Sequence, residues 1–527
     1  MFGWRRLSLQ DRAYMVLLNR SLIIILAYAF ASFCPSVDAS DRPNVLLIVS
    51  EDNGPELGCY DDPYAQTPHL DRLAGEGIIF RRAYVPQSGC SQSRASYLTG
   101  LYPHQHGQFG LATWGFRLYD DETPNLPRLL KGAGYRTGII GKLHINPGTA
   151  FPFDFKAIPS ANFQRKDLKD YEKYAEAFIN GSDEPFFLSI NYPEAHDPWI
   201  RQVNGIPKQP LDGDDIKPMA YMGVDHPALR ELVADYYNCI SRLDSLVGDL
   251  LQVLEDSGKA DDTMVIYLGD HGADMLRGKR TCYEGGLRIP MIIRWPGHIR
   301  QASSQQFVST IDLLPTILKA INLEVSKALP GVPLQPLFAG KLMPKQVFRE
   351  YLFAEYHTHA AAPNYFPQRS VRGDRFKLIL SLLPNTEHPD YSDTIRKLHG
   401  DHASRNSTLK LDIPALIASA PTDIRRAFEL MRCPPEVQLY DLRNDPYEFN
   451  NLANSPDHQL IKTTLLNQLH QWRVNTSDPL LKPSLLRRLT NEVQSITNKT
   501  LARKHTWQYP RYFSEGGRTE PSTSPDK

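Results

Sequence analysis

The chain has 527 residues, with 59 basic and 59 acidic side chains, and 41% of its residues are hydrophobic. A formal net charge of zero argues against broad nucleic-acid binding, which needs an excess of Lys and Arg facing phosphates. The length is ample to bury a full core, and the Pro and Gly content is too low for a low-complexity chain, so we expect a globular protein.

The N-terminus has the pattern of an export signal. Several arginines precede an apolar run at residues 22–33, which is shorter than the ~20 residues that span a bilayer but suits the core of a signal peptide. Val37-Asp38-Ala39 then fits a cleavage site. The sequence predicts a signal peptide at residues 1–39, whether translation starts at Met1 or Met15. The mature protein is expected to be exported (periplasmic, secreted or in a lysosome-like compartment) and to have no stable membrane span.

Segments typical of strands and helices alternate along most of the remaining chain. Short apolar runs predict buried strands, each followed by a polar loop, at 44–50, 137–140, 186–191 and 264–268. Apolar periodicity predicts helices at 69–76, 93–99, 126–133 and 228–256. This alternation predicts an α/β fold whose large, mostly parallel mixed sheet is flanked by helices. Ligands bind such sheets beyond the carboxyl ends of the strands.

The pattern changes after about residue 345. Short strands are expected at 351–355, 375–382 and 437–442, and a closing amphipathic helix at 460–472, which together predict a smaller α+β unit with an antiparallel sheet. The expected organisation is a main domain at 40–350, a C-terminal subdomain at 351–508 and a disordered tail at 509–527, the last from its Ser, Pro, Gly and charge content.

The cysteines point to one thiol with a separate role. Signal cleavage would remove Cys34 from the six cysteines and leave an odd number. The sequence contains no C-x-x-C pair, so the spacing of the cysteines does not indicate a zinc site. If Cys90 is the odd thiol, the other cysteines allow three pairings, and their choice stays open.

Cys90 opens the segment Cys90-Ser91-Gln92-Ser93-Arg94. Gly89 allows a sharp entry, and Ser91 or Ser93 can cap a starting helix, so Cys90 is expected at a helix N-terminus, where an anion is favoured. Taken alone, Cys90 would more often be a buried structural cysteine.

Two pairs of adjacent metal-binding side chains follow predicted strands: Glu51-Asp52 and Asp270-His271. Either pair alone could be a solvated loop. Two pairs in loops that converge above one sheet are better explained by a divalent cation, and carboxylates suit Ca²⁺, Mg²⁺ or Mn²⁺.

The segment that begins at Cys90 resembles the signature of the type I sulfatases, in the alkaline phosphatase superfamily. The resemblance covers roughly residues 42–475 and extends to Leu98-Thr99-Gly100, Gly141-Lys142-Leu143-His144, Tyr283-Glu284-Gly285-Gly286, Asp312-Leu313-Leu314-Pro315-Thr316 and Leu439-Tyr440-Asp441-Leu442. Within the family, His104-Gln105-His106-Gly107 and Pro152-Phe153-Asp154-Phe155 look most like the heparan N-sulfatases. Residues 40–350 would then form the catalytic sulfatase domain.

The resemblance implies a nucleophile made after synthesis. In the family, a formylglycine-generating enzyme oxidises the cysteine to Cα-formylglycine, whose hydrate attacks sulfur, and Cys90 stands at that position. Arg94 would support the nucleophile. The family's usual proline is replaced here by Gln92, which bears on recognition by the modifying enzyme.

The resemblance also implies a metal and an anion clamp. Glu51, Asp52, Asp270 and His271, with residue 90, match the ligands of one divalent cation, with calcium first and magnesium or manganese as alternatives. Glu51 and His271 stand where many members have Asp and Asn. Positions that bind sulfate oxygens or exchange protons are matched by Lys142, His144, His196 and Lys279.

A further set of side chains is expected to contact the sugar: His104, His106, Glu355, His357 and His359. His104 and His106 follow the helix that begins at Cys90, and by resemblance Glu355, His357 and His359 border the pocket. A solvated histidine-rich loop is an alternative of nearly equal weight for any one of these residues. The implied activity is hydrolysis of a terminal sulfated sugar in glycosaminoglycan degradation, with an N-sulfate first and an O-sulfate second. A homodimer is compatible with this interpretation.

Two other functions remain open from the sequence. A phosphonate or phosphate ester hydrolase of the same superfamily would use similar metal pairs. A glycan-binding protein that keeps Cys90 unmodified would retain the pocket without the nucleophile.

Overall fold

The structure is a computed structural model that describes residues 42–339, 348–388 and 411–517. The predicted signal peptide and its Cys34 lie outside the described residues, as do residues 518–527 of the predicted tail. From Pro43 onward the chain forms one compact unit.

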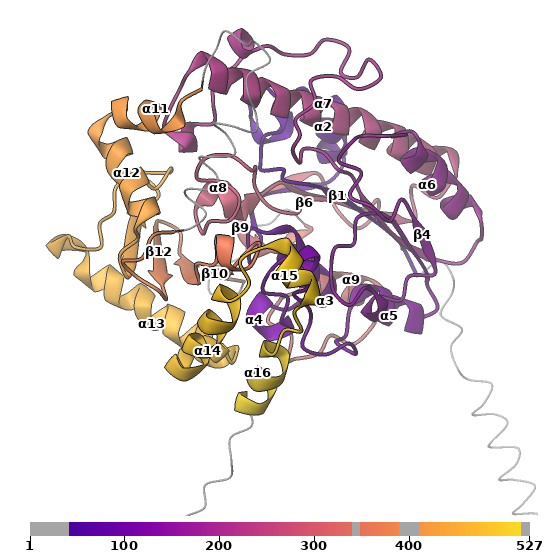
Figure 1. The fold of residues 1–527 in the computed structure, drawn as a ribbon. Helices are drawn as coiled ribbons and strands as arrows, with labels where there is room; N and C mark the ends of the chain where they lie inside the picture. Colours follow the sequence, from indigo (N-terminus) through magenta and orange to yellow (C-terminus); the bar gives the residue numbers. More distant parts are fainter. Residues whose placement is uncertain (1–41, 340–347, 389–410, 518–527) are drawn as a thin grey trace, which may run out of the picture. The chain divides into compact units, whose positions relative to one another are not determined.

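A nine-stranded mixed sheet forms the centre of this unit, in the order β4-β3-β5-β1-β6-β8-β2-β7, with β9 paired to β2 (Figure 1). The strands are β1 (Asn44–Ser50), β2 (Ile78–Tyr84), β3 (Arg136–Gly141), β4 (Phe155–Ala157), β5 (Phe186–Asn191), β6 (Thr263–Gly269), β7 (Arg288–Ile289), β8 (Met291–Arg294) and β9 (Ala302–Ser309). β4, β3, β5, β1 and β6 run parallel, whereas β8 is antiparallel to β6 and β2. The predicted mostly parallel sheet is thus confirmed.

Helices cover both faces of the large sheet. In Figure 1, α2 (Pro68–Gly75), α6 (Asp170–Asn180) and α7 (Pro227–Asp256) lie on one face, and α3 (Cys90–Thr99), α5 (Leu126–Gly132) and α9 (Leu313–Ala320) on the other. The short helices are α4 (Pro103–His106) and α8 (Glu284–Leu287). Because both faces are covered, the apolar residues 45–49 of β1 are completely buried, as a continuous hydrophobic run in a parallel sheet predicts.

A four-stranded antiparallel sheet follows in the chain, which confirms the predicted antiparallel sheet, although its second strand was not predicted. Its strands are β10 (Leu352–Tyr356), β11 (Gln368–Arg372), β12 (Phe376–Ser381) and β13 (Val437–Asp441). The amphipathic helix α13 (Gln459–Asn475) buries Leu465, Leu469 and Trp472 against this sheet. The remaining helices here are α11 (Ile413–Ser419) and α12 (Thr422–Arg432). The division into residues 40–350 and 351–508 stays a prediction.

The C-terminal tail differs from the expectation of disorder from residue 509. The chain continues through α14 (Pro483–Gln494) and α15 (Lys499–Lys504) into α16 (Tyr509–Gly517). Tyr509 and Phe513 are buried with Phe109 and Phe116 in a second hydrophobic cluster. The prediction was wrong for Tyr509–Gly517. It rested on the polar composition of the whole tail, whereas a few aromatic side chains bury this helix against the protein.

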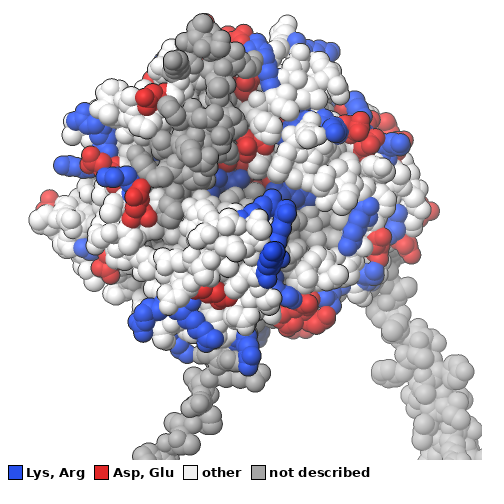
Figure 2. Space-filling model, viewed as in Figure 1, with Lys and Arg blue, Asp and Glu red and all other residues white. Residues whose placement is uncertain are grey.

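Charged side chains of both signs are mixed on the surface of the protein, in agreement with its net charge of zero. Figure 2 shows Lys and Arg interspersed with Asp and Glu on this face, without a continuous patch of either sign. Among the described residues, no helix combines the length and the apolar character that crossing a bilayer requires.

Candidate active site

The acidic residues that follow β1 and β6 meet at one edge of the large sheet. Ser50 pairs in register with Gly269, so Glu51-Asp52 and Asp270-His271 leave neighbouring strands at the same level. The Asp52 amide donates to Asp270 Oδ1 at 2.9 Å, and His271 Nε2 lies 3.3 Å from Asp52 Oδ1. All four side chains are completely buried. The two sequence pairs therefore form one cluster.

Cys90 lies against this cluster. It is the first residue of α3, and its Sγ is 3.4 Å from His271 Nε2. Burial by itself would raise the pKa of the thiol, but the charges of Lys142 and Lys279 outweigh burial and lower the pKa to about 6. The surroundings therefore favour an anionic atom at the position of Sγ.

Arg94, one turn further along α3, connects the cluster to the carboxyl ends of β5 and β3. Its guanidinium donates to Asn191 Oδ1 at 2.7 Å and to the Lys142 carbonyl at 3.0 Å. Its Nη2 lies 3.1 Å from Asp270 Oδ2. Asn191, the last residue of β5, was not among the predicted residues. Its signal in the sequence was a polar side chain at the carboxyl end of a buried strand.

Two lysines oppose the carboxylates. Lys279 Nζ donates to both oxygens of Asp52 at 2.9 Å, and Lys142 pairs with Glu51. Both lysines are buried, so their charges are poorly screened by solvent and act directly on Cys90. Positive charge therefore lies beside the residue at position 90, and the role of these lysines as an anion clamp stays a prediction.

The cluster fits a hard divalent cation. Ligand atoms of Asp52, Cys90 and His271 lie within 4.8 Å of one another, as do those of Glu51, Cys90 and Asp270. Glu51 Oε2 and Asp270 Oδ2 are buried and accept no hydrogen bond within the described part of the chain. Burial raises the pKa of Glu51 although Lys142 lies beside it. A cation would stabilise such carboxylate oxygens, and oxygen-rich sites suit Ca²⁺, Mg²⁺ or Mn²⁺.

A cavity of about 310 Å³ adjoins Cys90. Of the predicted residues, its lining includes Cys90, Lys142, His144, His196 and His359. The other lining residues are Leu111, Thr113, Pro159, Ala161 and Phe163, which no sequence motif indicated. Thr113 lies in a short 3-10 helix, and the other four lie in loops. The cavity thus brings three histidines and a lysine around one cysteine.

Two of the cavity histidines are held by specific contacts. His144 Nε2 lies 2.7 Å from Thr113 Oγ1, and burial keeps the pKa of His144 well below its usual range. The His196 ring stacks on Phe163 with centroids 3.9 Å apart, and its Nδ1 lies 2.6 Å from the Asp197 carbonyl oxygen. Both rings are therefore oriented in the cavity wall.

The loop that carries His196 is anchored by a buried ion cluster. Glu194 is completely buried between Arg242, whose Nε lies 2.6 Å from Oε1, and Arg165, whose Nη2 lies 3.2 Å from Oε2. Arg165 also donates to the His196 carbonyl. Because the Glu51 amide donates to the Glu194 carbonyl at 2.7 Å, this anchor connects His196 to the cluster of Glu51, Asp52, Asp270 and His271.

Four of the five residues expected to bind the sugar do not line the cavity: His104, His106, Glu355 and His357 are buried behind it. Glu355 accepts hydrogen bonds from the His104 amide at 2.8 Å and contacts His104 Nδ1 at 2.8 Å and Arg369 Nε at 3.4 Å. His106 Nε2 lies 3.1 Å from Ser96 Oγ on α3. His104 Nε2 and both ring nitrogens of His357 have no hydrogen-bond partner among the described residues. Of the five residues, His359 alone lines the cavity.

Gln92 connects α3 to two loops. Its Nε2 donates to the Phe109 carbonyl at 2.9 Å and to the Thr358 carbonyl at 2.6 Å, and the side chain is completely buried. Thr358 precedes His359, and Phe109 precedes the loop that contains Leu111. Gln92 therefore fixes two walls of the cavity relative to Cys90.

The five cysteines within the described residues form no disulfide: Cys59, Cys90, Cys239, Cys282 and Cys433 all have free thiols. Cys90 lines the cavity with a lowered thiol pKa, whereas burial raises the pKa of Cys239 and Cys282 to about 12. Cys90 is thereby distinguished from the other buried thiols.

Comparisons with known proteins agree with this geometry. The family model described as Sulfatase matches residues 43–323, and the model described as N-sulphoglucosamine sulphohydrolase, C-terminal, matches residues 269–392. The chain is 31% identical to N-sulphoglucosamine sulphohydrolase of Homo sapiens over 83% of this chain and 91% of the relative. It is 28% identical to an ulvan-active sulfatase of Formosa agariphila over 87% and 80% of the two chains.

A solved structure shares the fold. It is BT4656 in complex with its substrate D-glucosamine-2-N,6-O-disulfate, at a TM-score of 0.61 and 20% identity, covering 83% of this chain and 98% of that chain.

Proposed function

The chain belongs to the sulfatase family, and from this premise we propose that it hydrolyses the sulfate of a terminal sulfated sugar, with an N-sulfated glucosamine as the first choice. The observation that carries the proposal is Cys90 at a cavity lined by Lys142, His144, His196 and His359, beside a buried cluster that fits a cation. The family membership supports a sulfuric ester hydrolase or sulfamidase.

Residue 90 would provide the attacking atom after oxidation of its thiol to formylglycine by a formylglycine-generating enzyme. Its position at the start of α3 and at the cavity wall supports this role. Glu51, Asp52, Asp270 and His271 would hold the divalent cation, with calcium first. When bound, such an ion acts as a Lewis acid that stabilises a developing negative charge.

Lys142 and Lys279 would stabilise the charge of the sulfuryl group as it is transferred. Lys142 lines the cavity, and both lysines are held beside Cys90 by their carboxylate partners. Fixed positive charges in a buried site need no reorganisation when charge develops, which is the usual source of electrostatic catalysis.

The two oriented histidines suit the proton transfers. His144 stays neutral because burial lowers its pKa, so it can accept a proton. His196 Nδ1–H can donate a hydrogen bond to the Asp197 carbonyl, which leaves Nε2 free for the departing nitrogen or oxygen. Burial lowers the pKa of His196, so a proton taken up at Nε2 would be passed on readily. Lys279 is less suited to this step because it donates to both oxygens of Asp52 and does not line the cavity.

The choice of an N-sulfate rests on relatives. The human relative is an N-sulphoglucosamine sulphohydrolase, and the substrate in the solved structure carries both an N-sulfate and an O-sulfate. The cavity volume of about 310 Å³ is at the small end for ligand sites, which favours one terminal sugar over a chain segment. We further propose that the protein is exported, as the N-terminal pattern predicts.

The test compares sulfate release from glucosamine 2-N-sulfate, glucosamine 6-O-sulfate and 4-nitrophenyl sulfate, with 4-nitrophenyl phosphate as the competing substrate. We expect release from the N-sulfated sugar, an aldehyde or hydrate at residue 90 by peptide mass analysis, and no turnover in Cys90→Ala. Cys282→Ala, which removes a buried thiol outside the cavity, is the matched control and should remain active. Release from O-sulfates alone would refute the N-sulfate choice. Full activity in Cys90→Ala, or faster phosphate hydrolysis, would refute the sulfatase mechanism.

A further inference from the structure

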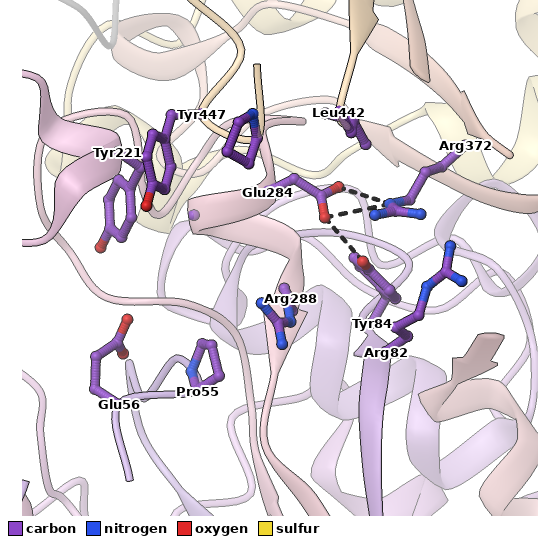
Figure 3. Close-up of a pocket in the computed structure, with 12 residues that line it drawn as sticks. Pro55, Glu56, Arg82, Tyr84, Tyr221, Glu284, Arg288, Arg372, Leu442 and Tyr447 are labelled. Carbon is purple, nitrogen blue, oxygen red and sulfur yellow. Dashed lines mark hydrogen bonds and ion pairs between the residues drawn. The ribbon is translucent and has the colours of Figure 1, made fainter. Parts of the chain in front are cut away.

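A second cavity, of about 350 Å³, lies outside the catalytic cavity and shares no lining residue with it (Figure 3). Pro55 and Glu56 line it a few residues after the metal-binding pair Glu51-Asp52. The other lining residues are Arg82, Tyr84, Tyr221, Glu284, Gly285, Arg288, Arg372, Leu442, Pro446 and Tyr447. Its wall thus combines arginines, tyrosines and carboxyl groups.

Glu284 in this wall is fully engaged by protein groups. Arg372 Nε donates to its two oxygens at 3.1 and 3.2 Å, and the Tyr84 hydroxyl donates at 2.8 Å, as Figure 3 shows. Lys377 Nζ adds a third donor at 3.1 Å. Lys377 also pairs with Glu448 at 2.8 Å, so the two carboxylates and the two cations of this group balance one another and leave no negative charge for the other arginines.

Arg288 is the cation without a counter-charge. Its Nε and Nη2 donate to one acceptor, the Arg81 carbonyl, at 3.1 and 2.9 Å, and no carboxylate of the described residues forms an ion pair with it. Figure 3 shows its guanidinium between Glu56 and Glu284. Burial raises the pKa of Glu56 to about 7, so that side chain offers only a partial negative charge. Arg82 in the same wall is paired with Asp374 at 2.8 Å, so the unbalanced positive charge of the cavity is that of Arg288.

The tyrosines give the cavity the character of a sugar site. Tyr447 is 41% exposed, which is unusual for a large side chain in a cavity wall. The Tyr221 hydroxyl is buried and has no hydrogen-bond partner among the described residues. Aromatic faces beside one unsatisfied hydroxyl donor suit a ligand that is apolar on one face and polar at its edges.

We propose that this cavity is a second saccharide site, which binds a sulfated or uronate-bearing sugar unit through Arg288 and the Tyr221 hydroxyl. Such a site goes beyond hydrolysis: it would hold an acidic glycan on the protein without acting on it. Binding there requires no nucleophile and no metal, so the proposal does not depend on the catalytic mechanism.

The test is calorimetric titration of the full-length Cys90→Ala protein with a heparin-derived disaccharide of uronate and N-sulfoglucosamine. Arg288→Gln should weaken the binding event at this cavity about 10- to 100-fold, the usual effect of losing a charge-assisted hydrogen bond. Arg426→Gln, on the exposed face of α12, is the matched control and should leave every binding event unchanged.

A second, smaller substitution keeps the proposal testable if Arg288→Gln fails to fold. Tyr221→Phe removes only a hydroxyl that makes no hydrogen bond in the described structure, and it should weaken binding about 2- to 10-fold. Inorganic sulfate and the unsulfated, uronate-free disaccharide should each bind at least 10-fold more weakly than the acidic disaccharide. Unchanged affinity in both variants would overturn the proposal. Equal affinity for inorganic sulfate would overturn its assignment to a saccharide. Because the titrated protein cannot turn over substrate, failure of the hydrolytic proposal would not alter these outcomes.

Discussion

Replacing Gln92 with proline restores the residue that type I sulfatases usually have and tests what the glutamine does here. Gln92 is the third residue of α3, where the backbone N–H has no partner within the helix, so proline is tolerated by the backbone. The change removes the donors to the Phe109 and Thr358 carbonyls. The helix should therefore persist while its connections to two cavity walls are lost.

The cost follows from these contacts. Two hydrogen bonds contribute about 1 kcal/mol each, and a carbonyl left buried without its donor costs about 1–3 kcal/mol more. Proline offsets about 0.4–1 kcal/mol by restricting the unfolded chain. We expect Gln92→Pro to lower the free energy of unfolding by about 2–4 kcal/mol, and Gln92→Ala, which lacks the proline offset, to lower it slightly more.

Urea unfolding of the three proteins measures this difference, and peptide mass analysis measures the oxidised fraction at residue 90. Gln92→Pro should be oxidised at least as completely as the parent, because it restores the family's recognition residue. A Gln92→Pro protein that is as stable as the parent would refute the structural role of the glutamine. If Gln92→Pro is destabilised as much as Gln92→Ala and has a lower oxidised fraction than the parent, the link between position 92 and maturation is refuted.

Three further outcomes are expected. Exhaustive chelation removes the cation and Asp270→Asn weakens its binding, so each should lower turnover at least 10-fold. The chelated protein should recover its activity when Ca²⁺ is added. An unchanged rate after chelation contradicts the metal site. Glu355→Ala should lower the free energy of unfolding by about 2–4 kcal/mol in urea titrations, because it removes two hydrogen bonds to His104 and leaves that residue buried without its carboxylate, while Arg369 keeps Asp478. A loss below ~1 kcal/mol contradicts this role. Burial lowers the pKa of His357 to about 4, so the unfolded chain binds a proton at this residue before the folded protein does as the pH falls below ~6.5. The free energy of unfolding should therefore decline from there towards pH 4. The urea midpoint of His357→Gln should decline less over this range than that of the parent, and equal declines would contradict the assignment.

The strands of the large sheet could be predicted because their cause is local. β1 and β5 have the predicted bounds, Asn44–Ser50 and Phe186–Asn191, since a continuous apolar run ended by polar residues is the pattern of a buried parallel strand. α16 could not be predicted in this way. Its stability depends on contacts of Tyr509 and Phe513 with Phe109, far away in the sequence.

The same distinction applies to the site. Glu51, Asp52, Asp270 and His271 follow strands, and the pairing of neighbouring strands brings them together, so their cluster was predictable. The histidines of the second group were not. Glu355 is in a strand and His104 is in a short helix, and whether they face the cavity or each other depends on how the two sheets pack.

The contacts of α16 also bear on the order in which the cavity can form. The Tyr509 hydroxyl donates to the Arg117 carbonyl and accepts from the Arg117 amide, both at 2.7 Å, across a separation of 392 residues. Arg117 belongs to the loop segment that also supplies Leu111 and Thr113 to the cavity wall. A ribosome adding roughly 5–20 residues per second needs about 20–80 s to make the chain between these partners, which are 392 residues apart. The wall segment beside Cys90 therefore gains this support only after Tyr509 has been made, and the surroundings of the thiol stay incomplete throughout that interval.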